Sequence, residues 1–394
     1  MSAAERSDRA PEGTPLYVHL PFCAAKCHYC DFFSVAGEGQ DGPGMVAAIL
    51  AEARLRAPRR PTTVFLGGGT PSYLSEAELR ALLDGLQEVT DFRASATEVT
   101  AECNPESLTL EKARLMRALG VNRVSIGFQS LQPEVLELFG RVHGVDESFR
   151  AFEHARAAGF ERVNVDLIYA HPGHSRASWE RDLARVLALG SEHLAAYNLS
   201  FEEETPFERW MAEGKLHPLP EELELELFAL TRELTARAGR PAYEISNYAK
   251  PGEACRHNVN YWRNGEYLGL GPSAASKVGF TRSGNVRSIA LYRRAIERGE
   301  TAAAWSETPS PALRLAETWW LGLRLVEGVE PALARRTAGW PEDAHDVFAE
   351  RAAALAEEGW LERRANAFAL SARGLPLADT LARRFFELVD DPAS

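Results

Sequence analysis

Six short apolar runs separated by helical patterns restrict the fold of this chain more than any other feature. The runs are LYVHL from Leu16, TVFLG from Thr63, EVTAE from Glu98, RVSIGF from Arg123, RVNVDLIY from Arg162 and HLAAYNLSF from His193. Helical stretches such as SEAELRALLDGLQEV lie between them. Short, nearly all-apolar strands that alternate with helices are typical of a parallel sheet covered on both faces. Because βα units are right-handed, the pattern predicts an α/β fold, an incomplete (β/α)6 version of the eightfold barrel.

The carboxyl ends of the strands in such a barrel lie on one face, and that face carries the active site. The residues that do not fit a plain strand or helix collect at these ends: Pro21 to Cys30, Gly67 to Pro71, Glu102 to Pro105, Gln129 and Asp166. We therefore expect them to form one site.

Four segments are expected along the chain. Residues 1–14 are a polar tail, 15–205 the barrel, 206–305 a cap on the barrel's open side, and 306–394 a small helical, winged-helix-like domain. The last segment begins at the TPSP junction and contains an expected hairpin between Leu361 and Leu370. We interpret it as a packing domain rather than a DNA-binding one, because a fold alone carries no function.

Charge and hydropathy restrict the partners and the location. A net charge of -12 argues against nucleic acid, whose binding needs a basic surface. The polar first residues lack the apolar core of a signal peptide, and no apolar run reaches the roughly 20 residues of a membrane span. We therefore expect a cytoplasmic protein without a transmembrane segment.

Three of the five cysteines, Cys23, Cys27 and Cys30, stand as C-x3-C-x2-C after the first strand. This crowding predicts a metal site rather than a disulfide framework. Three thiolates can hold three irons of a [4Fe-4S] cluster and leave one iron open to the amino and carboxylate groups of S-adenosylmethionine (SAM). The alternatives are a structural zinc completed by His28 and three cysteines packed in a core. Neither fits well, because no second cysteine pair follows and the neighbouring residues are polar.

Residues at the next strand ends are candidates for a SAM pocket. Glycines 67–69 would let backbone carbonyls approach a ligand ammonium group, although a plain strand-to-helix turn also explains them. Glu102, Gln129 and Asp166 could hydrogen-bond ribose or adenine; each alone is better explained as a helix cap or a satisfied strand-end polar group, but three on one rim favour a ligand site. Arg141, on the helix expected after Gln129, is either a partner of the ligand carboxylate or a solvated surface arginine.

With these motifs the sequence resembles the radical SAM superfamily, in the branch of the oxygen-independent coproporphyrinogen III oxidases and the HemW haem chaperones. The resemblance covers nearly the whole chain and is carried by YVHLPFCAAKCHYCDF, FLGGGTPS, ECNPES, GVNRVSIGFQS, NVDLIY and CRHNVNYW. It implies that the three cysteines ligate the cluster and that Tyr17, Gly68 and Glu102 contact the SAM bound there. In the oxidases a second SAM lies nearby, and its contacts would correspond to Tyr29, Gly69, Thr70, Gln129, Arg141, Asp166 and Ser200. Whether one or two molecules bind stays open.

The branch decides the expected function. The oxidases carry a further cysteine two places after the last cluster ligand, where this chain has Phe32, as HemW-like proteins do. His257 to Trp262 match the HNxxYW signature of HemW, in which an imidazole could ligate haem and two aromatic rings could cover a porphyrin face. A turn that simply packs under the cap explains these residues equally well. Cys255, two residues earlier, is either a soft ligand or, as we favour, a small buried residue.

The leading expectation is therefore a haem chaperone that binds a [4Fe-4S] cluster, SAM and haem. Its expected partners are haem or porphyrin, a haem-acceptor protein and an electron donor such as a flavodoxin or ferredoxin. The alternative is a coproporphyrinogen III oxidase, so enzymatic activity is left open. Two departures from the relatives leave a substrate-side group in doubt: Ala170 to His174 replace a GLPGQ stretch, and Ser273 to Ala275 replace GAH. His171 and His174 are either compensating groups on the active rim or ordinary loop histidines.

Overall fold

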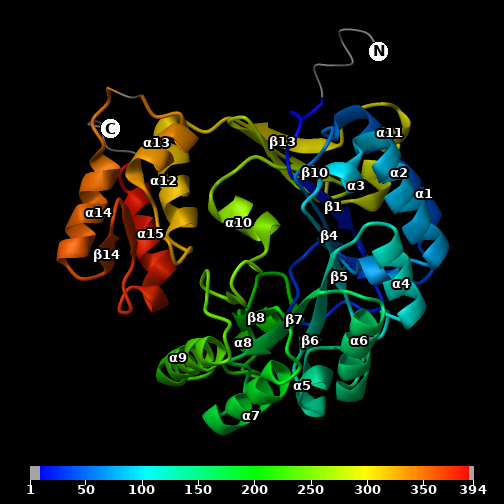
Figure 1. Ribbon diagram of the computed structural model, residues 1–394, viewed down its shortest axis with the longest axis horizontal. Helices are drawn as coiled ribbons and strands as arrows, with labels where there is room; N and C mark the ends of the chain where they lie inside the picture. Colours follow the sequence, from blue (N-terminus) through cyan, green and yellow to red (C-terminus); the bar gives the residue numbers. More distant parts are fainter. Residues whose placement is uncertain (1–8, 342, 390–394) are drawn as a thin grey trace.

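The computed structural model describes residues 9–341 and 343–389, so most of the predicted polar tail lies outside the described residues. The six apolar runs form six parallel strands, as the sequence predicts: β1 (Leu16–Leu20), β4 (Thr63–Gly68), β5 (Glu98–Cys103), β6 (Arg123–Gln129), β7 (Arg162–Tyr169) and β8 (His193–Asn198). They are neighbours in chain order within one curved sheet (Figure 1). The predicted α/β, partial-barrel fold is therefore confirmed.

Two short strands that the sequence pattern does not reveal extend this sheet at its edges. β10 (Leu268–Leu270) pairs in parallel with β1, and β9 (Asn247–Ala249) pairs antiparallel with β8. The resulting order is β10-β1-β4-β5-β6-β7-β8-β9, and within the described residues its two ends do not pair with each other. The barrel therefore stays open on one side.

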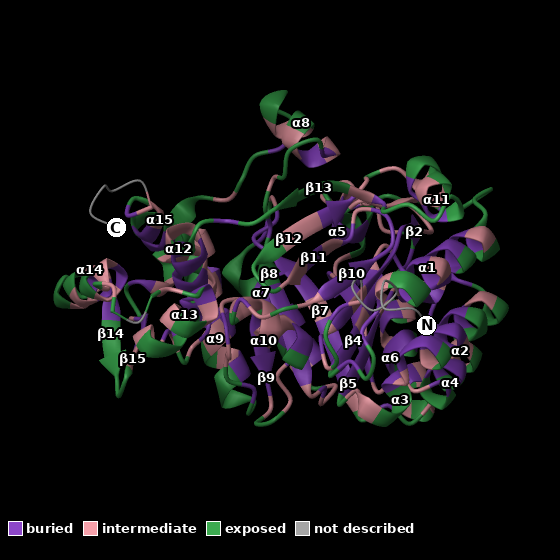
Figure 2. Ribbon diagram, turned by 90° about the horizontal axis from the view of Figure 1, so that it is seen from above, coloured by how far each residue is buried: buried purple, intermediate pink, exposed green. Residues whose placement is uncertain are grey.

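Helices cover the outer face of the sheet, and Figure 2 shows that the strands between them are largely buried. These helices are α1 (Gly42–Arg56), α2 (Glu76–Thr90), α3 (Phe92–Ser95), α4 (Leu110–Ala118), α5 (Pro133–Leu138), α6 (Val145–Ala157) and α7 (Arg176–Leu187). The start of α2 is set by a capping box, in which the Ser75 hydroxyl accepts from Glu78 N and the Glu78 carboxylate accepts from Ser75 N. Leu79, Leu82 and Leu83 then bury one helix face against the sheet.

The segment after the sixth parallel strand wraps around the barrel at several places. Its elements, besides β9 and β10, are α8 (Pro206–Ala212), α9 (Glu221–Arg237), α10 (Arg256–Trp262), β11 (Ala275–Val278), β12 (Thr281–Asn285), α11 (Ile289–Glu297) and β13 (Ala303–Glu307). Helix α9 packs on α7, and α11 packs on α1. Helix α10 contacts β4 through Thr63, the first residue of that strand, whose hydroxyl lies 2.8 Å from His257 Nδ1. The HNxxYW helix therefore closes the amino-terminal end of the barrel, opposite the strand ends that carry the predicted site.

The last segment forms a unit with its own core beside the barrel (Figure 1). It consists of α12 (Pro311–Gly322), α13 (Pro331–Ala338), α14 (Val347–Glu357), the hairpin β14 (Leu361–Arg364) and β15 (Ala367–Leu370), η3 (Leu375–Leu377) and α15 (Ala378–Phe386). Trp319 stacks on Phe385 with ring centroids 5.0 Å apart at the centre of this core. The expected hairpin is present, and α12 contacts α10 of the neighbouring segment. No helix among the described residues is both long and apolar enough to cross a bilayer.

Candidate functional site

The three motif cysteines lie on a loop that the backbone closes at its base. Cys23 ends the two-residue strand β2 (Phe22–Cys23), which pairs in parallel with β3 (Val35–Ala36). Two backbone bonds of 2.8 Å, from Val35 N to Pro21 O and from Gly37 N to Cys23 O, join the two ends of the loop. Inside the loop, Cys30 N donates to Cys27 O at 3.4 Å. The motif is thus presented at the carboxyl end of β1, as the sequence predicts.

All three thiols are free and line one cavity of about 460 Å³. Among the described residues, no three His, Cys, Asp or Glu side chains converge closely enough to hold one metal ion. A single zinc ion needs ligands that meet at one point about 2.3 Å from each sulfur. In a cubane cluster each thiolate binds a different iron, so the three sulfurs need only line one cavity.

The surroundings of Cys23 and Cys30 hold these two thiols protonated when no metal is bound. Burial raises the pKa of Cys23, and it raises the pKa of Cys30 to about 11. The Thr70 hydroxyl donates to Cys23 Sγ at 3.4 Å, and Arg141 Nη1 donates to Cys27 Sγ at 3.4 Å. The Thr70 donor favours the thiolate form of Cys23, and iron that displaces the thiol protons finds both hydrogen bonds already in place.

The glycine run after β4 packs directly against the cysteine loop. Gly69 N donates to Leu20 O at 2.7 Å, and Thr70 N donates to Phe22 O at 2.8 Å. A methyl group on Gly69 would lie 2.6 Å from the first of these carbonyl oxygens and 2.7 Å from the second. Gly68 has a φ of 97°, a left-handed conformation that favours glycine. These glycines therefore position the cysteine loop, in addition to leaving room for a ligand.

Arg141 lies inside the site rather than on the protein surface. It follows α5 instead of lying on a helix, which corrects the sequence expectation. Its Nη2 donates to Asn104 Oδ1 at 2.7 Å and to Gly127 O at 3.0 Å. Asn104 Nδ2 in turn donates to Thr70 Oγ1 at 3.0 Å. Sequence reasoning did not assign Asn104 a role, although its place two residues after Glu102 at a strand end was a usable signal.

Two partly buried carboxyl groups, those of Glu102 and Asp166, face the same cavity from β5 and β7. Burial, reinforced by the charge of Asp166, raises the pKa of Glu102 to about 8, although Gly68 N donates to its carboxylate at 3.2 Å. Burial also raises the pKa of Asp166 to about 6, against hydrogen bonds from Ser125 Oγ at 2.8 Å and Asn164 Nδ2 at 2.6 Å. A cationic ligand in this cavity would favour the ionised form of both groups. SAM, with its sulfonium and ammonium groups, is such a ligand.

Gln129 provides an unpartnered polar atom that faces the cavity. It ends β6 at a register shift and has a φ of 65°, which is unusual for a residue other than glycine. Its Oε1 is buried without a hydrogen-bond partner in the described part of the chain. Buried acceptors are nearly always satisfied in native proteins. An unsatisfied amide oxygen and a strained backbone at one residue indicate that a ligand completes the site.

The other predicted SAM contacts divide between two cavities. Tyr29 and Ser200 line the cysteine cavity. Tyr17 does not; it lines a neighbouring cavity of about 280 Å³ in the barrel interior, with its hydroxyl 3.0 Å from His19 Nδ1. Gly68 and Glu102 line both cavities, so Tyr17 lies next to the predicted site without lining it.

His257, the predicted haem ligand, is buried and uses both ring nitrogens. Its Nδ1 lies 2.8 Å from Thr63 Oγ1, and its Nε2 lies 2.9 Å from Tyr261 Oη. Burial lowers its pKa to about 3, so the ring is neutral. Cys255 is buried as expected, with its Sγ 3.4 Å from a carboxylate oxygen of Glu98. In this conformation the histidine positions Tyr261 and has no nitrogen available for iron.

Two segments differ in sequence from the relatives, residues 170–174 and 273–275, and neither lines the cysteine cavity. His171 and His174 are buried and stack on each other with ring centroids 3.9 Å apart. Ala275 lines a third cavity, of about 370 Å³, between the barrel and the last domain.

Comparison with known proteins agrees with this site. The model of the radical SAM superfamily matches residues 17–186, which include all three cysteines. The haem chaperone HemW of Bacillus subtilis is 34% identical over 94% of this chain and 98% of its own length. HemW of Escherichia coli is 39% identical over 67% of this chain and 70% of its own. The solved structure of the E. coli coproporphyrinogen III oxidase HemN, a radical SAM enzyme, shares the fold with a TM-score of 0.81 at 23% identity, over 97% of this chain and 92% of that one.

A [4Fe-4S] cluster and SAM are the cofactors of the superfamily, and the residues of this site fit both groups. Held by Cys23, Cys27 and Cys30 and reduced by an external electron donor, the cluster would supply the electron for reductive cleavage of SAM. The full-length identity to HemW proteins, together with the cysteine loop at the carboxyl ends of the strands, establishes that the chain belongs to the HemW family of the radical SAM superfamily.

Proposed function

We propose that this protein is a haem chaperone: it binds haem and passes it to an acceptor protein. The observation that carries the proposal is the identity of 34% to the haem chaperone HemW over 94% of this chain. One feature of the site supports it. Phe32, which stands where the oxidases carry a further cysteine, lies at the mouth of the cysteine cavity with 64% of its surface exposed.

In this proposal Cys23, Cys27 and Cys30 hold the cluster, and the cavity around them holds SAM. Glu102 and Asp166 supply negative charge to the cationic ligand, and Arg141 orders the wall beside the cluster. The amide oxygen of Gln129 supplies an acceptor. The remaining contacts expected from the resemblance are Tyr17, Tyr29, Gly68, Gly69, Thr70 and Ser200.

The test of the proposed function is a haem titration of the anaerobically purified protein, followed by transfer to an apoprotein that requires haem. A stoichiometric change in the Soret band, and its reappearance in the acceptor, would support the proposal. No Soret change at equimolar haem would refute it. An electron donor such as a flavodoxin or ferredoxin can be tested separately, by reduction of the bound cluster.

The second candidate, coproporphyrinogen III oxidase activity, is favoured by the likeness in fold to HemN. It predicts that reduced, cluster-loaded protein converts coproporphyrinogen III to protoporphyrinogen and releases 5′-deoxyadenosine. Absence of both products would exclude this activity. Deoxyadenosine without porphyrin turnover would indicate a radical reaction on another substrate.

A further inference from the structure

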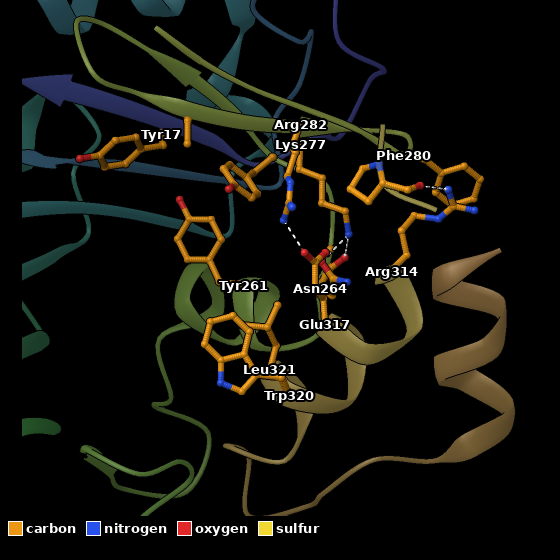
Figure 3. Close-up of a pocket in the computed structure, with 14 residues that line it drawn as sticks. Tyr17, Tyr261, Asn264, Lys277, Phe280, Arg282, Arg314, Glu317, Trp320 and Leu321 are labelled. Carbon is orange, nitrogen blue, oxygen red and sulfur yellow. Dashed lines mark hydrogen bonds and ion pairs between the residues drawn. The ribbon is translucent and has the colours of Figure 1, made fainter. Parts of the chain in front are cut away.

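The cavity between the barrel and the last domain has the composition of a ligand site. Its volume is about 370 Å³, at the lower end of the roughly 300–1,000 Å³ typical of small-molecule sites. Residues of β1, α10, β11, β12 and α12 line it, so three parts of the chain contribute (Figure 3). It shares no lining residue with the cysteine cavity. The site where SAM is expected is therefore a different one.

Aromatic side chains form a large part of the walls of this cavity. Five of its lining side chains are Tyr17, Tyr261, Tyr267, Phe280 and Trp320. Phe280 and Trp320 keep 43% and 37% of their surface exposed, so large rings lie at an opening to solvent. Aromatic faces that stay partly exposed around a cavity favour a flat apolar ligand.

The polar residues of the cavity are mostly cationic. Lys277, Arg282 and Arg314 line it, and Glu317 is the one acid among its lining residues. This excess of positive charge contrasts with the net charge of -12 of the whole chain. Such a cavity favours a ligand with carboxylate groups.

Lys277 has no counter-ion among the described residues, and neither does Arg314, which donates to the backbone oxygens of Ala338 and Pro309. The Lys277 ammonium group donates to the backbone and side-chain oxygens of Asn264, both neutral. No carboxylate in the described residues lies within ion-pair distance of it, unlike Arg282, which pairs with Glu307 at 2.8 Å and with Glu317. Burial lowers the pKa of Lys277 to about 8. A carboxylate from a ligand would compensate this partly buried charge.

Tyr261 connects this cavity with the HNxxYW helix. Its ring lies against Tyr267 with centroids 4.6 Å apart, and its hydroxyl is held by His257 Nε2 at 2.9 Å. Figure 3 shows Tyr261 and Trp320 on one side of the cavity, with Lys277 and Arg282 reaching in from the sheet above. The motif thus contributes an aromatic wall to the cavity through Tyr261, although His257 itself does not line it.

We infer that this inter-domain cavity is where the protein holds haem, with the porphyrin ring against Tyr261 and Trp320 and the propionates near Lys277 and Arg282. The inference rests on the proposed haem chaperone function and gives it a location. The small volume and exposed rim leave part of the ring outside. Such partial enclosure suits a ligand that must be passed on.

The test compares haem affinity, measured by Soret difference titration, among variants that keep the cluster and bind SAM normally. Lys277→Met with Arg282→Gln should weaken haem binding about a hundred-fold, roughly ten-fold for each charged hydrogen bond removed. Ala275→Phe, which fills the cavity, should weaken it without changing a charge. Arg298→Gln, a control at the exposed residue that follows α11, should bind like the wild type.

A modified ligand separates charge recognition from folding effects. Haem dimethyl ester lacks free carboxylates, so the wild type should bind it about a hundred-fold more weakly than haem. The double variant should bind the two ligands equally. If wild type binds haem but the double variant and Ala275→Phe bind it equally well, the location is wrong and the chaperone function stands. If the wild type itself binds no haem, the proposed function fails.

Discussion

The protonation of Glu102 gives a quantitative prediction about the unfolding of the metal-free protein. Its pKa is about 8 in the folded state against an ordinary value of 4.5. Between these values the unfolded chain loses the proton and the folded chain keeps it, so the free energy of unfolding falls as the pH rises. Glu102→Gln keeps the size of the side chain and removes the titration. The variant should therefore gain stability relative to the wild type across this range.

The size of the effect follows from the pKa difference. The interval from 4.5 to about 8 corresponds to about 5 kcal/mol at 1.36 kcal/mol per pH unit. This figure is an upper limit, because Glu102 lines a cavity that water can enter and screen. We compare the free energy of unfolding of the variant with that of the wild type at each pH. Above pH 8 the difference in favour of the variant should exceed the difference at pH 4.5 by about 2–5 kcal/mol.

The assay is urea unfolding of metal-free wild type and variant at intervals from pH 4.5 to pH 9. Asp166→Asn serves as a control. Because the pKa of Asp166 is about 6, the difference in unfolding free energy between this variant and the wild type should stop changing once the pH rises above that value. A difference between wild type and Glu102→Gln that stays constant over the whole range would refute the claim that Glu102 is buried and protonated.

Four further outcomes follow from the structure. SAM binding to the cluster-loaded protein at pH 7 should release protons as the cationic ligand lowers the pKa of Glu102, visible as a buffer-dependent binding enthalpy that Glu102→Gln abolishes. Cys27→Ala should abolish the iron and sulfide content after anaerobic reconstitution, whereas Cys103→Ala, a buried cysteine outside the motif, should keep both. Gly69→Ala should also lose the cluster, because its methyl group would lie 2.6 Å from Leu20 O. Gly144→Ala is the control: no atom lies closer than 3.8 Å to its methyl group, so the unfolding free energy should change by less than about 1 kcal/mol. Glu98→Ala should cost about 3–5 kcal/mol of unfolding free energy, since this buried carboxylate accepts the first amides of α10 and lies 3.8 Å from Arg123; urea unfolding that matches wild type would contradict this.

The local pattern of the chain determined the barrel strands and the cysteine motif. Apolar runs such as Arg162–Tyr169 are buried on both faces, and their period and length suffice to identify them. The spacing of Cys23, Cys27 and Cys30 on one short loop also requires no distant partner. Both features are encoded by neighbouring residues, which is why they could be predicted.

Tertiary packing decided the features that join distant parts of the chain. Three-residue strands such as Asn247–Ala249 are too short for a pattern and exist because a neighbouring strand supplies their hydrogen bonds. Arg141 could not be told from a surface arginine until Asn104 and Gly127 lay beside it. The HNxxYW helix lies at the amino-terminal end of the barrel because the backbone amide of His257 donates to the carboxylate of Glu98, 159 positions away. No local sequence pattern encodes such a contact, because its stabilisation depends on which surfaces the completed fold brings together.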